Sequence, residues 1–416
     1  MCNGTRDQTT RRVALTPYWA FAVFGAFWGV WGASLPRLRE LASITDGQLG
    51  IALLFVGAGA LPAMLLTGRA LDRWGLWLTG PLLLSLGVTG CLVPLAAGSG
   101  FAALCGGMAV VGAVSGASDV AMNSLAGRAE RTTGRPTIAT AHATLSAVVV
   151  VASLGTGVLG AAGGAFLVPF ALVALAAAAA CIAIVRAVPT GPQASDPERG
   201  DAGAVAGLPV ALVLGLGMLG ALAFAGENAH QSWSAVLLED ELATPVGLSA
   251  IGPAVFAAVV AVTRFAIARV SPRHARTVIL VGAMVATAGA LLLAAAPSLT
   301  IALVALGLAA AGTAVLFPTI LAIVSRAVPE HRRGRTTSLV TTVAYTGFLA
   351  GPPYVGLVAD AVDLRGAMIG VAALTALLVV LVPVVLRWNA ASGAGPEDVG
   401  VRSADGRGSR PSSTRS

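Results

Sequence analysis

Apolar runs long enough to cross a bilayer recur along the whole chain, separated by short polar segments. A span needs about 20 apolar residues, and twelve such runs alternate with loops rich in Arg and Gly. The predicted spans are 17–36, 47–68, 76–97, 101–125, 138–160, 164–186, 208–236, 247–268, 276–297, 299–325, 336–358 and 366–387. The pattern therefore predicts an all-α integral membrane protein with twelve transmembrane helices.

A polar stretch divides these spans into two sets of six. It is rich in Pro, Gly, Ala and Asp, a composition typical of a flexible linker, and the end of the chain is similarly polar and aperiodic, which predicts disorder. The expected organisation is a cytoplasmic tail at 1–16, a first half at 17–187, a linker at 188–207, a second half at 208–388 and a disordered tail at 389–416.

The two halves also share a sequence repeat. Both join an apolar run to the next through a basic loop that ends in GRPT or GRTT. Five positions match at an offset of 200: Gly107, Gly112, Gly134, Arg135 and Thr137 correspond to Gly307, Gly312, Gly334, Arg335 and Thr337. A parallel internal repeat is typical of a transporter built from two similar halves.

Composition supports the membrane assignment. The chain has 416 residues, of which 56% are hydrophobic and only 11% charged, whereas a soluble domain carries roughly 25% charged residues. Soluble folds, and water-filled metal or nucleotide sites, are excluded. The four cysteines form no disulfide or metal-binding pattern, so we expect no cofactor.

The basic residues indicate orientation rather than a nucleic-acid partner. The chain has no Lys, and its net charge of +7 comes from Arg residues spread over short loops. Almost all lie in the terminal tails and in the loops that leave even-numbered spans, which predicts that both termini are cytoplasmic. The expected location is the bacterial cytoplasmic membrane, with the bilayer as partner and the monomer as the oligomeric state.

An ionisable residue inside the fourth span is the first candidate for function. Asp119 shares one helical face with Ser115, Gly116 and Asn123, and lies roughly 13 Å from the inner boundary at 1.5 Å per residue. Because a charge at membrane depth is costly, Asp119 is a candidate proton carrier or hydrogen-bond acceptor for a polar substrate. The alternative is a carboxylate that only packs helices.

The seventh span carries a polar island. Glu227, His230, Gln231 and Ser234 share a face at i, i+3, i+4 and i+7, and Asn228 and Trp233 lie among them. Gly226 favours a local break, a device that transporters use to present polar groups in a cavity. The alternative places this island outside the membrane, as a surface helix.

Aromatic and histidine residues complete the candidate cavity. Trp28 and Trp31, with Phe24, form a stripe on the first span that is suited to stacking on a sugar ring or an aromatic ligand. His142 and Tyr345 are further candidates, although core packing or lipid contact would also explain such residues.

The segment after the second span resembles a known signature. It reads Gly68-Arg69-Ala70-Leu71-Asp72-Arg73-Trp74-Gly75 and is similar to the G-x-L-x-D-R-x-G motif of the major facilitator superfamily. The resemblance implies a cytoplasmic gate containing Gly68, Asp72, Arg73 and Gly75, and we include Arg135 and Arg335 from the repeated loops. The alternative is an ordinary basic loop. The segment after span eight, Arg264 to Arg269, lacks the acidic residue of the motif.

Three further segments resemble the subfamily related to fucose permease. Glu227, Trp233 and Ser234 match its E-G-A-x-x-D-W-S tract, although Gln231-Ser232 stands where Ala-Asp is common. The other segments are residues 348–353 and 119–123. This resemblance implies uptake of a sugar or another small polar solute.

The sequence thus predicts a secondary transporter that works by alternating access. We expect coupling to protons, with Asp119 and Glu227 as carriers. The alternative is proton-driven efflux of drugs or natural products. A membrane enzyme or a receptor is a weaker hypothesis, because the sequence offers no metal-spaced cluster, no nucleophile with an evident base and no phosphate-binding loop.

Overall fold

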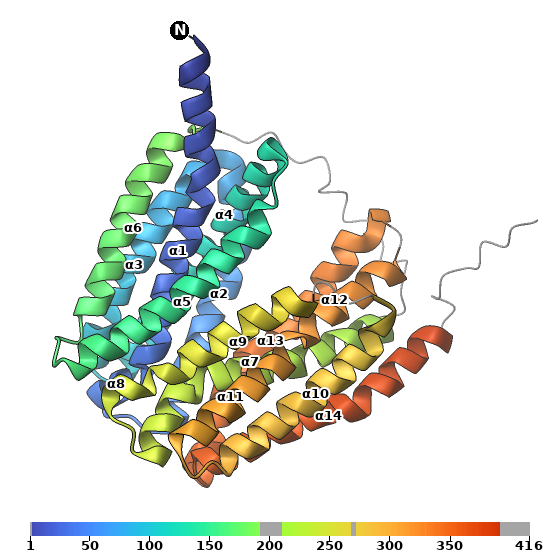
Figure 1. The fold of residues 1–416 in the computed structure, drawn as a ribbon. Coiled ribbons are helices and arrows are strands. Elements are labelled where there is room, and N and C mark those ends of the chain that lie inside the picture. The colour runs from blue at the N-terminus through green and yellow to red at the C-terminus, as the bar shows by residue number, and fades with distance from the viewer. Residues whose placement is uncertain (1, 192–209, 268–271, 329, 392–416) are drawn as a thin grey trace, which may run out of the picture.

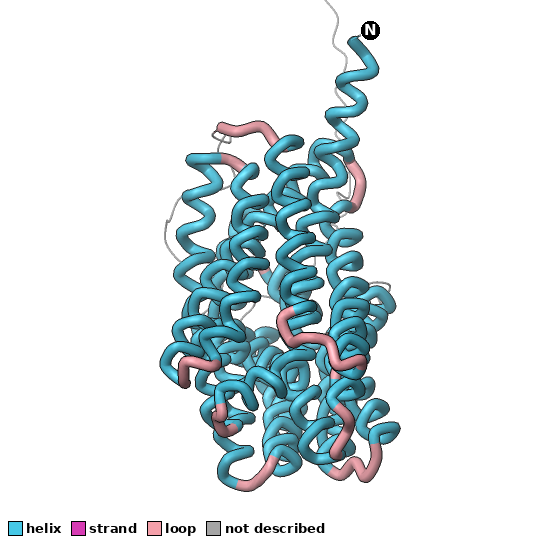
Figure 2. The backbone as a smooth tube through the Cα atoms, turned by 90° about the vertical axis from the view of Figure 1, so that its left-hand side faces the viewer, coloured by secondary structure: helices cyan, strands magenta, loops and turns pink. Residues whose placement is uncertain are grey.

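The computed structural model describes residues 2–191, 210–267, 272–328 and 330–391. Within these ranges every regular element is helical (Figure 2). The first half contains α1 (Cys2–Ala42), α2 (Asp46–Trp74), η1 (Leu76–Leu78), α3 (Thr79–Ala97), α4 (Phe101–Thr133), α5 (Thr137–Ala161) and α6 (Val168–Ala187). The second contains α7 (Val210–Leu242), α8 (Val246–Ser249), α9 (Ile251–Ile267), η2 (Pro272–His274), α10 (Ala275–Ala294), α11 (Leu299–Ala314), α12 (Leu316–Ala327), α13 (Glu330–Ala361) and α14 (Leu364–Ala391).

Helices occupy all twelve predicted spans. Among the described residues, eleven segments are long and apolar enough to cross a membrane, with α8–α9 and α11–α12 each contributing to one of them. The twelfth span is α13, which falls short of the others in hydropathy because of its Thr, Gly and Pro residues. It packs against α7 and α2 inside the bundle.

The two halves form separate bundles that meet at one end and diverge at the other (Figure 1). The joined end carries the α1–α2 and α7–α8 connections; the divergent end carries the N-terminus and the α4–α5 loop. At the joined end, Ser153 of α5 donates a 2.8 Å hydrogen bond to the carbonyl oxygen of Ala250. A Cβ on Gly50 of α2 would come within 2.9 Å of the carbonyl oxygen of Pro352 in α13.

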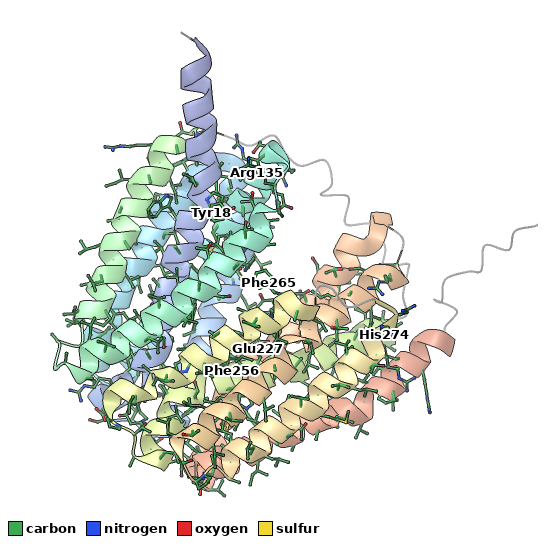
Figure 3. All side chains as sticks on the ribbon, in the orientation of Figure 1. Tyr18, Arg135, Glu227, Phe256, Phe265 and His274 are labelled. Carbon is green, nitrogen blue, oxygen red and sulfur yellow. The ribbon has the colours of Figure 1, made fainter. Side chains whose placement is uncertain are left out.

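The buried core follows this arrangement. One hydrophobic cluster runs through the first half and continues into Trp233, Leu237 and Val355 of the second half. A second cluster, which includes Leu216 and Val340, belongs to the second half alone. In Figure 3, Arg135 and Phe265 border the wedge that separates the halves at the divergent end. The halves therefore share packing only where they are joined.

The glycine that ends the predicted signature is required by the backbone. Gly75 has a φ of 96°, and its N–H donates to the carbonyl oxygen of Leu71 at 2.8 Å, which ends α2. A Cβ there would also collide with the carbonyl oxygen of Gly191. Positive φ and close backbone approach both favour Gly. Gly75 therefore allows the end of α2 to pack closely against Gly191, where the connection between the halves begins.

One prediction differs from the structure, and one helix extends beyond the predicted span at 17–36. The break at Gly226 is wrong, because α7 runs without interruption from Val210 to Leu242; Gly226 instead allows the Thr375 methyl group to approach its Cα closely. The helix α1 begins at Cys2 and so extends through the predicted tail at 1–16. Most of the predicted linker and of the tail at 389–416 lies outside the described residues.

Candidate functional site: a cavity between the halves

A cavity of about 330 Å³ lies between the two halves. Its walls come from α1, α2, α4 and α5 of the first half and from α7 and α13 of the second. The volume is in the range of small-molecule sites. Six of the predicted site residues line it: Trp28, Trp31, Asp119, Asn228, Gln231 and Tyr345. The other six lie outside the lining: Asn123, His142, Glu227, His230, Trp233 and Ser234.

Asp119 reaches the cavity from the middle of α4, beside the small residues Ser115 and Gly116. The amide nitrogen of Asn123 donates to its Oδ1 at 3.2 Å, and the Oδ1 of Asn123 in turn accepts a 3.2 Å hydrogen bond from Nε2 of His142. Within the described part of the chain, Asp119 forms no ion pair. This leaves a half-buried carboxylate whose charge no protein cation balances.

Aromatic side chains form much of the remaining wall. On α1, Phe24, Trp28 and Trp31 lie in succession, with centroid distances of 6.2 Å and 6.1 Å. Across the cavity, Tyr345 of α13 lies 5.6 Å from Phe224 of α7 and 6.1 Å from Phe348. The predicted stripe on the first span therefore faces the cavity, together with a second aromatic cluster that the sequence analysis did not identify.

The polar island of α7 points in three directions. Asn228, Gln231 and Ser232 line the cavity. Glu227 points toward α9, where both carboxylate oxygens accept hydrogen bonds from Nη2 of Arg264 at 2.9 Å and 3.0 Å.

The third direction is the packed interior of the protein. His230 and Trp233 are fully buried. Nδ1 of His230 donates to the carbonyl oxygen of Gly226 at 2.7 Å and the ring stacks on Phe256, while Nε1 of Trp233 donates to the carbonyl oxygen of Pro352 at 3.2 Å. Ser234 is buried as well. These three residues hold helices together and do not face the cavity.

Sequence reasoning did not assign a role to Arg264. Pro318 has no N–H, so it cannot form the usual helical bond to the carbonyl group of Ala314 four residues earlier. The guanidinium group of Arg264 approaches that carbonyl, with its Nε at 3.4 Å, while its Nη2 binds Glu227. An Arg within an apolar run could have indicated such a role, but the sequence analysis treats Arg264 only as part of a loop motif.

A charged cluster at the joined end was also missed, because its members looked like ordinary loop charges. Arg39 of α1 forms an ion pair with Asp46 and donates to both carboxylate oxygens of Asp240 in α7, at 2.6 Å and 2.7 Å. Thr45 donates to Asp360 of α13 at 2.8 Å. Both contacts to α7 and α13 cross between the halves, so this cluster holds the joined end together.

The predicted cytoplasmic gate lies at the divergent end. Gly68, Asp72 and Arg73 belong to the last turns of α2, where the guanidinium group of Arg73 lies 5.8 Å from the ring centroid of Trp74. Arg135 is exposed next to Gly134, whose left-handed φ of 64° ends α4. Arg335 lies in α13, but its side chain is outside the described residues. The gate assignment stays a prediction.

Comparison with known proteins adds independent information. The family model of the Major Facilitator Superfamily matches residues 216–403. An uncharacterized transporter of Sinorhizobium fredii is 29% identical over 384 residues, covering 88% of this chain and 96% of the relative. The membrane protein MosC of Rhizobium meliloti is 28% identical over 357 residues, covering 84% of each.

Two solved structures have the same fold. A bacterial homolog of the human lysosomal transporter Spinster, in an inward-facing and unoccupied conformation, superposes with a TM-score of 0.72 at 14% identity, covering 92% of this chain and 98% of the other. The nucleoside transporter NupG gives 0.71 at 11% identity, with coverage of 91% and 99%.

Two six-helix halves around a central cavity, with eleven described segments long and apolar enough to cross a membrane, form an architecture that secondary transporters use. The second half of the chain matches the major facilitator superfamily, and most of the chain is similar to transporters in sequence and in fold. The resemblance to the fucose-permease subfamily is not shown by these comparisons.

Proposed function

We propose that this protein moves a small organic solute through the central cavity in exchange with, or together with, protons, and that Asp119 is the proton carrier. The position of Asp119 carries the proposal: it lines the cavity between the halves and has no ion-pair partner among the described residues. A carboxylate in such surroundings is neutral when protonated and costly when ionised, so solute and proton occupancy are energetically linked there.

Glu227, the second carrier predicted from sequence, fits this role less well in the present conformation. Both of its carboxylate oxygens already accept hydrogen bonds from Arg264. We therefore assign the coupling proton to Asp119 first. We further propose, from the Arg distribution, that the divergent end faces the cytoplasm and that the joined end is closed toward the outside.

Two solute classes have specific support. The amide and hydroxyl groups of Asn228, Gln231 and Ser232 in the cavity favour a sugar or another polar solute, in line with the fucose-permease resemblance. The aromatic lining on α1, α7 and α13 favours the alternative, efflux of a drug or natural product with an aromatic body.

The test begins with a thermal-shift screen of purified protein against sugars, organic acids and hydrophobic drugs, since a ligand of the folded state raises its apparent stability. Ligands that shift the midpoint are then tested in proteoliposomes that contain a pH-sensitive dye. We expect solute-driven proton movement in the wild type, and counterflow without proton movement in Asp119→Asn. Proton coupling that is unchanged in Asp119→Asn contradicts the proposal, and a loss of coupling in Glu227→Gln alone would assign the proton to Glu227 instead.

A further inference from the structure

The charges around the cavity are unequally distributed. Asp119 is the single Asp, Glu, Arg or His among the residues that line it. An ionised carboxylate removed from water is stable only when a cation or strong hydrogen bonds compensate it. The Asn123 amide supplies one hydrogen bond. A proton or a positively charged ligand would complete the compensation.

Arg264, which interacts electrostatically with His142, is already engaged. Arg264 binds Glu227 with its Nη2 and approaches the carbonyl oxygen of Ala314 with its Nε, and it does not belong to the cavity lining. It therefore offers no free positive charge to an anionic solute inside the cavity. An organic acid would add a second negative charge beside Asp119, which is unfavourable at low dielectric constant.

The walls match an organic cation better than a metal ion. A bound Ca²⁺ or Mg²⁺ ion takes six or more oxygen ligands, and among the described residues no cluster of His, Cys, Asp and Glu is suited to a metal. Ammonium groups, by contrast, are attracted to the faces of Trp, Tyr and Phe. Trp28 on one side and Tyr345 on the other provide such groups, and the Tyr345 phenol is close enough to Asp119 for their charges to interact.

We propose that the transported solute is an amphipathic amine with an aromatic body, whose ammonium group replaces the proton on Asp119. The inference deepens the proposed function and rests on its assignment of the coupling proton to Asp119. Binding of the ammonium ion breaks the carboxyl O–H bond of Asp119, and the released proton leaves toward the aqueous side that the cavity faces. Amine and proton then occupy the carboxylate alternately, so their movements are opposite.

Other titratable groups near Asp119 contribute to the pH dependence of amine binding. His142 of α5 is connected to Asp119 through Asn123 and interacts electrostatically with Arg264. Tyr345 interacts with Asp119 from α13. Glu227, on α7, is a further titratable group. A charged His142 would weaken amine binding. Measurements at pH 7.5, above the ordinary His pKa of about 6.5, keep this contribution small.

The test compares matched probes that differ in charge alone. Tryptamine and 2-phenylethylamine carry an ammonium group, whereas tryptophol and 2-phenylethanol have the same aromatic bodies with a hydroxyl group. Isothermal titration calorimetry of the purified protein, in two buffers with different ionisation enthalpies, reports affinity and proton release together. We expect each amine to bind at least tenfold more tightly than its alcohol and to release a fraction of one proton.

Variants test whether the preference for the amine over the alcohol depends on the carboxylate of Asp119. Asp119→Asn should lose the preference for the amine, and Asp119→Glu should retain it, which also controls for misfolding. Glu130→Gln, at the far end of the same helix where Glu130 accepts a hydrogen bond from the Ile138 N–H, should behave as the wild type. Equal affinity for amine and alcohol, no amine binding across the panel, or a preference that survives in Asp119→Asn overturns the inference.

The two proposals fail in different ways. If a neutral sugar binds and drives proton movement that depends on Asp119, proton coupling stands and the cationic solute is wrong. If amines bind through Asp119 without proton release, the solute class stands and proton exchange at this carboxylate is wrong.

Discussion

At the scale of single residues, two carboxylates near the centre of the protein have opposite surroundings. Asp119 lines the cavity and has an amide as its partner, whereas Glu227 binds the guanidinium group of Arg264. Their positions along apolar helices look equivalent in the sequence. Their partners differ because α9 brings Arg264 beside α7, whereas Asp119 on α4 forms no ion pair with any described residue.

A double-mutant cycle should detect the Glu227–Arg264 pair. Since 43% of the Arg264 side chain is exposed, solvent screens the interaction, and we expect a coupling free energy of about 0.5–1 kcal/mol. Thermal midpoints of Glu227→Gln, Arg264→Gln and the double variant measure it. The exposed Arg37–Glu40 pair of α1 is the matched control and should give a value near zero. Additive effects at Glu227 and Arg264 would show that the contact contributes nothing.

At the scale of helices, proline residues create carbonyl groups that side chains from other helices satisfy. Pro352 cannot donate to the carbonyl group of Phe348 four residues earlier, and the amide nitrogen of Asn228 in α7 donates to that oxygen at 2.7 Å. Pro318 and Arg264 repeat the arrangement at Ala314. Asn228, a residue of the polar island of α7, therefore stabilises the packing of α7 against α13 and also lines the cavity.

The contribution of Asn228 should depend on Pro352. Asn228→Leu removes the donor and should lower stability by about 1–2 kcal/mol, the cost of a buried carbonyl group without a partner. In a Pro352→Ala background the N–H of residue 352 can bind Phe348, so the same substitution should cost clearly less. Chemical or thermal unfolding of the four proteins in detergent gives the comparison. An equal cost in both backgrounds would mean that Asn228 stabilises the protein in another way.

At the scale of the whole molecule, the joined end determines which side of the cavity is closed. Arg39 connects α1 to α7 through Asp240 and also binds Asp46, and the side chain of Arg39 is only 16% exposed. Both ion pairs cross a boundary between helices, and the pair with Asp240 crosses between the halves. Breaking them should favour conformations in which the divergent end closes.

Spin labels can measure this shift without a known solute. Labels on cysteines at positions 135 and 326, in a background without the native cysteines, report the separation of the halves at the divergent end. Arg39→Gln should increase the population of shorter distances about tenfold if it removes about 1.4 kcal/mol of stabilisation. Arg37→Gln, which breaks a pair within α1 alone, should leave the distribution unchanged. An unchanged distribution in Arg39→Gln would show that other contacts keep the joined end closed.

The sequence by itself determined the fold class. Long apolar runs must form helices in a bilayer, because no water is present to satisfy their backbone groups, and the sequence repeat at an offset of 200 indicated two related halves. It also singled out Asp119, since a carboxylate stands out in an apolar run.

The tertiary structure alone decided which polar residues face one another. His230, Trp233 and Ser234 share a helix with Gln231, yet they are buried between packed helices while Gln231 lines the cavity. Arg39 and Asp240 are 201 residues apart in the chain and Glu227 and Arg264 are 37 apart. Helical periodicity predicts which residues share a face, but only the packing of helices distant in sequence determines what that face contacts.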